Sequence, residues 1–130
     1  MANAYIAGVG LYAPEKVVKN DYFNDLYKKD ISTFLKENRN IYQRHWMNSN
    51  QSTSDLILPA AQKALESAQV QASDLDLIIV ATDTPDYLSP STAAVVQHKM
   101  KASRAGTFDL NAACAGFVTA LDTARRYIET

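Results

Sequence analysis

The uncharged run Leu77–Thr82 constrains the fold of this chain more than any other segment. It reads Leu-Ile-Ile-Val-Ala-Thr and follows directly on Asp74-Leu75-Asp76. β-Branched side chains favour strands, and a strand that is apolar on both faces needs cover on both of them. We therefore expect Leu77–Thr82 to be a strand in a sheet with helices on both sides.

Segments with helical periodicity flank this strand and predict that cover. Residue types that cap helices gather at Ser52–Asp55 and at Ser91-Thr92, where side-chain oxygens can accept free backbone N–H groups. Apolar residues recur behind the first cap at three- and four-residue spacing, as far as Ala68. The predicted helices begin at these two caps, and a third extends from Ala112 to Ile128.

Two further strands are predicted, a buried one at Ala4–Leu11 and another at Gly106–Leu110. Strands and helices then alternate, which indicates crossover connections, a largely parallel sheet and the α/β class. Short helices are predicted at Asn20–Tyr27 and Ser32–Asn38, whereas Ile41–Met47 has no clear pattern. Because three strands make a thin sheet, we interpret residues 1–130 as one domain that is incomplete.

Bulk properties exclude several classes of protein. The formal net charge is −1, so the overall charge attracts neither nucleic acid nor an anionic membrane. No apolar run reaches about 18 residues, the length of a membrane span, and Met1–Gly10 lacks the pattern of a signal peptide. One cysteine and two histidines give neither a disulfide nor the spacing of a metal site. We expect a cytoplasmic protein without a metal.

Cys114 is the residue on which any chemistry here would depend. It lies in the segment Asp109–Phe117, where a predicted strand ends and a helix rich in small residues begins. In the first turn of that helix, unpaired N–H groups and the helix dipole favour the thiolate, which is the nucleophilic form of cysteine. The same pattern fits an inert cysteine in the core. The residues alone leave both interpretations open.

The stretch Asn111–Phe117, Asn-Ala-Ala-Cys-Ala-Gly-Phe, closely resembles the active-site motif of ketoacyl synthase III, within the thiolase-fold superfamily. Other parts of that family are resembled in the same order by Ile6–Glu15, Gln43-Arg44-His45, Asp76–Thr82 and Pro90-Ser91. This ordered set extends over essentially all of the chain. The resemblance implies a thiolase-like α/β fold with αβαβα layers, of which residues 1–130 form most of the N-terminal half.

The resemblance also implies a reaction. In such enzymes the cysteine, here Cys114, takes an acyl group from an acyl thioester, usually of coenzyme A, and covalent capture divides one hard step into two. The acyl group then condenses with malonyl on acyl carrier protein, and carbon dioxide is released. The backbone N–H of Cys114 would be one donor of the oxyanion hole. The implied protein is a homodimer of fatty acid or polyketide-type biosynthesis that needs no cofactor besides the thioester substrate.

Substrate contacts are implied at two segments. A tryptophan and an arginine that hold the adenine end of coenzyme A in the family match Phe34 and Asn38 here. Phe34 can still stack on a base, but Asn38 carries no charge, and the neighbouring Arg39 is rotated by about 100° along a helix. Arg44 fits the basic pattern better, although arginines of this kind are often only solvated. The acyl donor is therefore coenzyme A or acyl carrier protein.

The second segment is the loop Asp83–Ser89, which matches the part of the family that closes the acyl pocket, often across a dimer. Tyr87 and Leu88 are its apolar candidates for substrate binding. An ordinary surface loop is the other interpretation, because loops carry both roles.

Three interpretations of the whole chain compete. The family takes a catalytic histidine and asparagine from its second half, whereas His45 and His98 lie outside any such motif and are interpreted as structural or surface residues. The 130 residues alone would then be an inactive piece of an enzyme. The alternative is a non-catalytic partner subunit or remnant of the same fold. A nucleotide-binding module is disfavoured, because Gly8-Val9-Gly10 lacks the third glycine of the fingerprint.

Overall fold

A computed structural model describes residues 3–130, and the chain divides into two compact units. We call them the sheet unit, Met1–Tyr12 with Ser52–Thr130, and the hairpin unit, Ala13–Gln51. Cys114 lies in the sheet unit, which is built around two parallel strands. Each unit is described by itself below.

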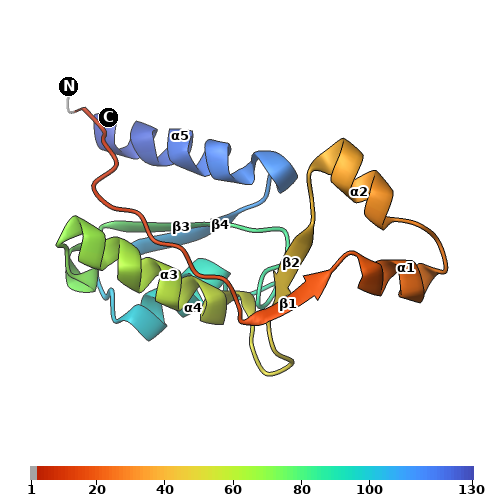
Figure 1. Cartoon of the computed structure of the whole chain (residues 1–130). Helices are drawn as coiled ribbons and strands as arrows, with labels where there is room; N and C mark the ends of the chain where they lie inside the picture. Colours follow the sequence, from red (N-terminus) through yellow and green to blue (C-terminus); the bar gives the residue numbers. More distant parts are fainter. Residues whose placement is uncertain (1–2) are drawn as a thin grey trace. The chain divides into compact units, whose positions relative to one another are not determined.

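The sheet unit has a layer of helices on each face of its strands, as the uncharged run Leu77–Thr82 predicts. Figure 1 shows α5 on one face and α3 with α4 on the other. Strand β3 pairs with β4 in parallel, with Leu77 opposite Gly106 and Ala81 opposite Leu110. The elements are α3 (Thr53–Ala68), the 3₁₀ turn η1 (Ala72–Asp74), β3 (Leu77–Ala81), α4 (Thr92–Met100), β4 (Gly106–Leu110), the 3₁₀ turn η2 (Ala113–Ala115) and α5 (Gly116–Glu129).

Both predicted caps start a helix where the sequence places them. Asp55 accepts a hydrogen bond from the Ser52 backbone N–H at 2.9 Å, which satisfies the first turn of α3. The Ser91 hydroxyl accepts the Ala94 N–H of α4 at 3.2 Å. Among residues 3–130, no helix is long and apolar enough to cross a membrane.

The core lies between the strands and α4. Val80 of β3 and Val96 of α4 are 6% and 1% exposed, and Ala93 and Ala102 are completely buried. Small side chains at these positions let α4 approach the sheet closely. The face of the sheet toward α5 is more open, with Phe117 and Tyr127 of α5 largely exposed.

The strand predicted at Ala4–Leu11 is wrong, because these residues form no regular secondary structure and several of their side chains are exposed. Within residues 3–130, β3 and β4 hydrogen-bond only to each other, and this apolar segment pairs with neither strand. It follows α3 instead. A side chain at Gly8 would come within 2.5 Å of the Ala64 carbonyl oxygen, and Gly10 has a similar close contact with Ala60. The glycines serve this close approach of two backbones.

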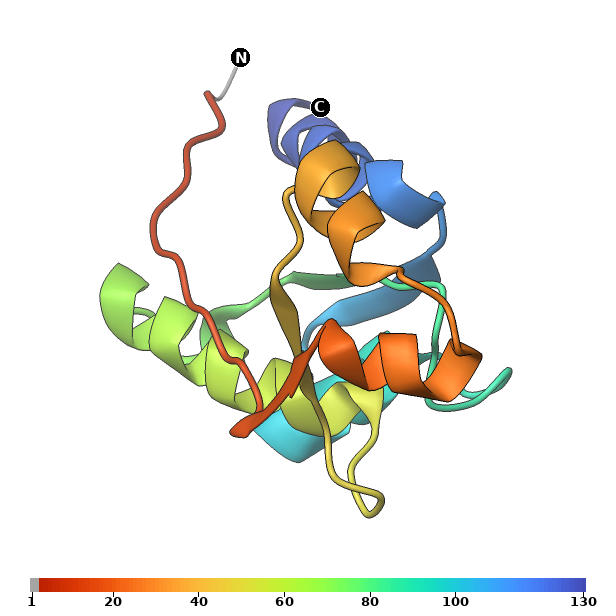
Figure 2. The ribbon, with the colours of Figure 1, turned by 45° about the vertical axis from the view of Figure 1, so that its right-hand side comes forward.

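The hairpin unit contains an antiparallel pair of strands joined through two short helices (Figure 2). Its elements are β1 (Lys16–Lys19), α1 (Asp21–Tyr27), α2 (Ser32–Arg39) and β2 (Gln43–Trp46). Both short helices confirm the sequence prediction, whereas the two strands were not predicted. Tyr22 and Phe23 pack edge-to-face on Trp46, with ring centroids 5.4 and 5.9 Å apart from it. This aromatic contact joins α1 to β2, residues far apart in sequence, and local pattern does not reveal it.

Candidate active site

Two segments leave the sheet at the same edge. The chain after β3 forms the loop of residues 83–91, and the chain after β4 carries residues 111–115. The strands are parallel and in register, and the Thr82 N–H donates to the Leu110 carbonyl at 3.0 Å just beyond them. Ligands of open α/β sheets bind outside the carboxyl ends of the strands. This edge is therefore the first place to look for a site.

Cys114 lies at this edge in a strained turn. It is the middle residue of η2 and its side chain is exposed. The Asn111 side-chain oxygen accepts the Ala113 N–H at 3.1 Å, and Ala113 has a φ of 44°. That left-handed conformation costs a residue with a Cβ about 1–2 kcal/mol. Strain of this kind occurs where a turn must present a side chain for chemistry.

The prediction that Cys114 belongs to the first turn of the last helix is wrong by two residues. α5 begins at Gly116, with Ala115 as its N-cap, and Cys114 precedes that cap. Gly116 is buried, and a side chain there would lie 3.4 Å from the Ala81 side chain. The helix begins where the chain passes close to β3, and the left-handed Ala113 prevents an earlier start.

The backbone N–H of Cys114 remains available as a hydrogen-bond donor. Ala113 and Ala115 on either side donate to Asn111 and Ala112, whereas the Cys114 amide donates to no acceptor among residues 3–130. An exposed thiol and a free amide of the same residue are two of the groups that acyl transfer requires.

Asp109 connects β4, the strand before Cys114, to α4, and sequence reasoning missed it. Its carboxylate accepts the N–H groups of Thr92 at 2.7 Å and Ala93 at 2.8 Å. These amides belong to the first turn of α4, which has no hydrogen-bond partners within the helix. The Asp109 carboxylate therefore fixes the start of α4. Asp109 itself lies five residues before Cys114 in the sequence. An aspartate next to the end of an apolar strand is the only sequence signal for this role.

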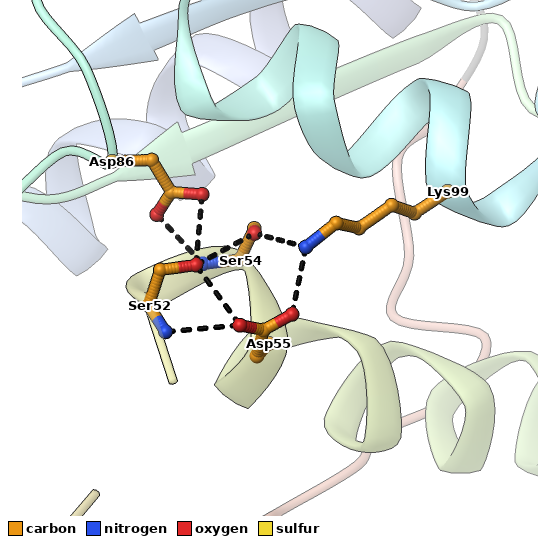
Figure 3. A network of polar contacts seen from close by, with 5 residues as sticks. All are labelled: Ser52, Ser54, Asp55, Asp86 and Lys99. Atoms are coloured by element: carbon orange, nitrogen blue, oxygen red, sulfur yellow. Dashed lines mark hydrogen bonds and ion pairs between the residues drawn. The ribbon is translucent and has the colours of Figure 1, made fainter. Parts of the chain in front are cut away.

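A second polar cluster lies where the loop of residues 83–91 meets the N-terminus of α3 (Figure 3). Its members are Ser52, Ser54, Asp55, Asp86 and Lys99. The Lys99 ammonium donates to the Ser54 hydroxyl at 2.8 Å and to Asp55 at 2.7 Å. The bond from Lys99, followed by those from Ser52, lowers the pKa of Asp55 to about 2. We call these five residues the α3 cluster.

Asp86 is charged at neutral pH although it is half-buried. Burial raises the pKa of Asp86, but hydrogen bonds from Ser54 and Ser52 and the charge of Lys99 outweigh that effect, so the pKa lies below its usual value. The Ser54 N–H donates to one carboxylate oxygen at 2.9 Å, and the Ser52 hydroxyl donates to the other at 3.1 Å.

Tyr87 and Leu88 follow Asp86 in this loop and are 59% and 102% exposed. They do not line the apolar groove of about 1220 Å³ in the sheet unit, and neither does Cys114. That groove lies between α5 and the strands, and Phe117, Leu121 and Tyr127 are among its residues. The structure thus places both loop residues at the edge of Cys114 without enclosing them in a cavity.

Phe34 and Arg44 belong to the hairpin unit. Phe34 on α2 is 52% exposed, and the Arg39 guanidinium lies over its ring at 5.4 Å. Arg44 on β2 is bound within the unit, because it donates to the Asn20 side chain at 2.8 Å and lies 4.5 Å above the Phe23 ring. Asn20 is 1% exposed and donates to the Ile41 carbonyl at 2.7 Å. Arg44 therefore has a structural role, and its predicted contact with substrate stays a prediction.

Neither histidine is part of the Cys114 turn. The His45 ring nitrogen Nδ1 is 2.5 Å from the Pro14 carbonyl oxygen in the hairpin unit. His98 is exposed in the last turn of α4.

Comparison with known proteins shows which enzymes the segment around Cys114 is similar to. The family model of 3-oxoacyl-[acyl-carrier-protein] synthase III matches residues 108–130, which include Cys114 and all of α5. β-Ketoacyl-[acyl-carrier-protein] synthase III of Xylella fastidiosa is 46% identical over 129 residues, which are 98% of this chain and 39% of that protein. Over nearly its whole length, this chain is similar to part of β-ketoacyl-[acyl-carrier-protein] synthase III.

Solved structures agree with this similarity and show the thiolase-like fold. 3-Oxoacyl-[acyl-carrier-protein] synthase III of Aquifex aeolicus is 36% identical with a TM-score of 0.83, over 95% of this chain and 40% of that one. The priming β-ketosynthase of a polyketide biosynthetic pathway is 33% identical with a TM-score of 0.84, over 95% of this chain and 37% of that one. The chain thus spans about two fifths of the length of the relatives that it matches.

Proposed function

We propose that this protein is a condensing acyltransferase, which loads an acyl group from an acyl thioester onto Cys114 and condenses it with malonyl on acyl carrier protein. The observation that carries the proposal is the turn at Cys114. There an exposed thiol and a free backbone amide lie at the carboxyl edge of a parallel sheet, in a chain similar to part of β-ketoacyl-[acyl-carrier-protein] synthase III.

In the first step the Cys114 thiolate adds to the thioester carbonyl carbon. Negative charge develops on the carbonyl oxygen, and the Cys114 N–H is placed to donate a hydrogen bond to it. The adduct then collapses, the bond to the donor sulfur breaks, and the donor leaves as a thiolate that takes up a proton. The acyl group remains as a thioester on Cys114, as in other nucleophilic mechanisms.

In the second step the malonyl group loses carbon dioxide and its electron pair attacks the carbonyl of the acyl-cysteine. The carbon–sulfur bond to Cys114 breaks, so that 3-oxoacyl-[acyl carrier protein] and the free thiolate result. A histidine and an asparagine stabilise the charge in enzymes of this kind, and we place both outside these 130 residues. In support, the His45 ring is hydrogen-bonded to the Pro14 carbonyl, and His98 is exposed on α4.

The donor in this proposal is an acyl thioester of coenzyme A or of acyl carrier protein. Phe34 stacks on the adenine of coenzyme A. Arg39, whose guanidinium lies over the Phe34 ring, adds a positive charge beside the phosphates. The proposed setting is fatty acid or polyketide-type biosynthesis, and in support one similar structure is named for a polyketide biosynthetic pathway. We further propose that the protein is a cytoplasmic homodimer.

Acylation of the protein tests this proposal directly. The whole reading frame that encodes the chain is expressed and incubated with acetyl-, butyryl- and octanoyl-coenzyme A, and peptide mass spectrometry locates the adduct. We expect one acyl group on Cys114, none in Cys114→Ala, and the normal adduct in the exposed-site control Ser103→Ala. Addition of malonyl-[acyl carrier protein] should then release carbon dioxide and free Cys114.

If the wild-type protein forms no adduct with any coenzyme A or acyl carrier protein thioester, the proposal that it is an enzyme is wrong. The chain would then be a non-catalytic subunit that keeps the thiolase-like fold.

A further inference from the structure

The turn between β4 and α5 is fixed at both of its ends. On one side the Leu110 carbonyl accepts the Thr82 N–H at 3.0 Å. On the other side Gly116 is buried, and a side chain there would lie 3.4 Å from the Ala81 side chain. The residues 111–115 therefore connect two points that are held against β3 and its end, and their backbone has few ways to do so.

Asn111 supplies the side-chain hydrogen bond of this turn. Residues 111–115 read Asn-Ala-Ala-Cys-Ala, so Asn111 and Cys114 carry its only polar side chains. The Asn111 side-chain oxygen accepts the Ala113 N–H at 3.1 Å, two residues further along the chain. Asparagine is frequent in turns because its side chain reaches such an N–H. Asn111 is exposed at the end of β4, so its bond acts on the turn and not on the core.

The bond holds a residue in a conformation that it would otherwise rarely adopt. Ala113 has a φ of 44°, which is unfavourable for a residue with a Cβ. A right-handed Ala113 would rotate the peptide unit that joins it to Cys114, because that unit is rigid and turns as a whole. The Cys114 N–H belongs to this peptide unit. The conformation of Ala113 therefore sets the direction of the Cys114 N–H.

The Cys114 N–H is the donor that this turn leaves unused. The Ala115 N–H donates to the Ala112 carbonyl at 2.9 Å, and the Gly116 N–H donates to the Ala113 carbonyl. The Cys114 amide has no acceptor among residues 3–130. A donor stabilises a developing oxyanion only if it points at the position that the oxygen will occupy. The direction of this N–H is therefore the property that acyl transfer requires of the turn.

We propose that Asn111 is a positioning residue, which holds Ala113 in its left-handed conformation and thereby directs the Cys114 N–H toward the carbonyl oxygen of the acyl thioester. This inference rests on the proposed function, because it assumes that Cys114 is acylated. Asn111 acts through Ala113 and not on the reacting atoms. A residue that only stabilised the fold would change stability and access to the thiol, with no preference for a reaction that forms an oxyanion.

Two reactions of the same thiol separate these roles. Acylation by acetyl-coenzyme A passes through an adduct with a negative oxygen, so it needs the Cys114 N–H. In alkylation by iodoacetamide the Cys114 sulfur bonds to the CH₂ carbon while iodide leaves, and no oxyanion develops. Both reactions need an accessible thiolate. The ratio of the two rates therefore reports on the amide and cancels changes in the amount or exposure of thiolate.

Three variants change the turn in graded steps. Asn111→Ala removes the acceptor, and Asn111→Ser keeps a side-chain oxygen that bonds such an N–H more weakly. The double variant Asn111→Ala with Ala113→Gly lacks the acceptor, but glycine adopts a positive φ at no steric cost. Asn50→Ala is the control, since Asn50 is an exposed asparagine of the hairpin unit. The melting temperature of each variant checks that it is folded.

The first measurement is amide hydrogen exchange at Ala113 in the protein expressed from the whole reading frame. We expect exchange about fivefold faster in Asn111→Ala than in the wild type, which is the change that loss of one hydrogen bond of ordinary strength produces. Asn50→Ala should exchange at the wild-type rate. Unchanged exchange in Asn111→Ala overturns the hold of Asn111 on the turn.

The second measurement is the rate of Cys114 acylation by acetyl-coenzyme A relative to its alkylation by iodoacetamide. We expect this ratio to fall by about fivefold or more in Asn111→Ala and by less in Asn111→Ser, because a misdirected amide stabilises the oxyanion less. The double variant should return toward the wild-type ratio, since glycine recovers the left-handed turn. Asn50→Ala should leave the ratio unchanged.

Three results would overturn the positioning role. They are an unchanged ratio in Asn111→Ala, an equal fall in both rates, and a ratio that stays low in the double variant. A wild-type protein that is alkylated at Cys114 but never acylated instead contradicts the proposed function and with it the catalytic consequence of the turn. The exchange at Ala113 still decides in that case whether Asn111 holds the turn.

Discussion

The two faces of the β3–β4 sheet differ in how completely the chain covers them. Toward α4, Val96 is 1% exposed and Ala93 is completely buried, and Asp109 fixes the first turn of the helix. Toward α5, Phe117 and Tyr127 are 72% and 63% exposed beside the open apolar groove. Both helices lie on the same two strands, so the difference arises from their own side chains.

The comparison shows which side supports the candidate site. Small residues and a capping carboxylate bring α4 close to the sheet, and the loop with Tyr87 and Leu88 is attached to that side through Asp86. α5 touches the strands at the buried Gly116 and presents large apolar side chains outward. The framework of the Cys114 edge is therefore held from the α4 side.

A buried charge should have the largest effect on the two faces. Val96→Asp is expected to lower the free energy of unfolding by at least about 3 kcal/mol, because the carboxylate would be buried without a partner. Leu121→Asp on α5, which is 43% exposed, should cost less than about 1 kcal/mol. Urea unfolding followed by circular dichroism measures both. Equal costs would show that the α5 face is as tightly packed as the α4 face.

Removal of the cap of α4 should have the next largest effect. Asp109→Ala leaves the N–H groups of Thr92 and Ala93 unpaired and is expected to cost about 2 kcal/mol of unfolding free energy. Asp109→Asn should restore part of it. Asp122→Ala on α5 removes only exposed pairs with Arg125 and Arg126 and should give no measurable change. A harmless Asp109→Ala would contradict the view that α4 supports the site.

Acid should weaken the α3 cluster in a defined range of pH. The folded pKa of Asp55, about 2, lies below the value of about 3.9 in an unfolded chain. Its contribution to stability is therefore complete above about pH 4 and is lost as the pH falls toward about 2. Carboxyl NMR titration measures this pKa, and Lys99→Met should raise it. An unchanged value in that variant would assign the shift to Ser52 alone.

Salt should affect the ion pair of Asp122 with Arg125 on α5 more than that of Asp55 with Lys99. The pKa of Asp122 is lowered mainly by its hydrogen bond with Arg125, and both side chains are more exposed than those of Lys99 and Asp55. About 1 M sodium chloride screens exposed pairs most strongly, so the pKa of Asp122 should rise more than that of Asp55. The same NMR titration measures both, and a larger rise at Asp55 would reverse the expected order.

The smallest effect is expected on the open face. Phe117→Ser should change the free energy of unfolding by less than about 0.5 kcal/mol, as is usual for an exposed position, and should reduce binding of a hydrophobic dye to the groove. Tyr127→Ser provides a second position on the same helix. A loss above about 2 kcal/mol would mean that Phe117 is packed against the sheet in solution.

The sequence by itself determined the parts of the fold that local physics controls. The uncharged run of β3 requires cover on both faces. The caps at Ser52–Asp55 and Ser91 start helices because the side chains of Asp55 and Ser91 accept backbone N–H groups three residues away. The motif around Cys114 predicted the resemblance to ketoacyl synthase III, and the similar proteins confirm that resemblance. Its role as nucleophile stays a prediction for the acylation experiment.

Tertiary structure alone decided the features that depend on distant partners. Ala4–Leu11 is apolar enough for a strand, but a strand needs another backbone to pair with, and here the segment follows α3. The hydrogen bonds of the Asp86 and Asp109 carboxylates join residues that are 16 to 34 positions apart, so no local pattern predicts them. Spacing along a chain specifies what a residue's neighbours can form, whereas the position of a carboxylate against a helix 30 residues away is settled only when the layers pack.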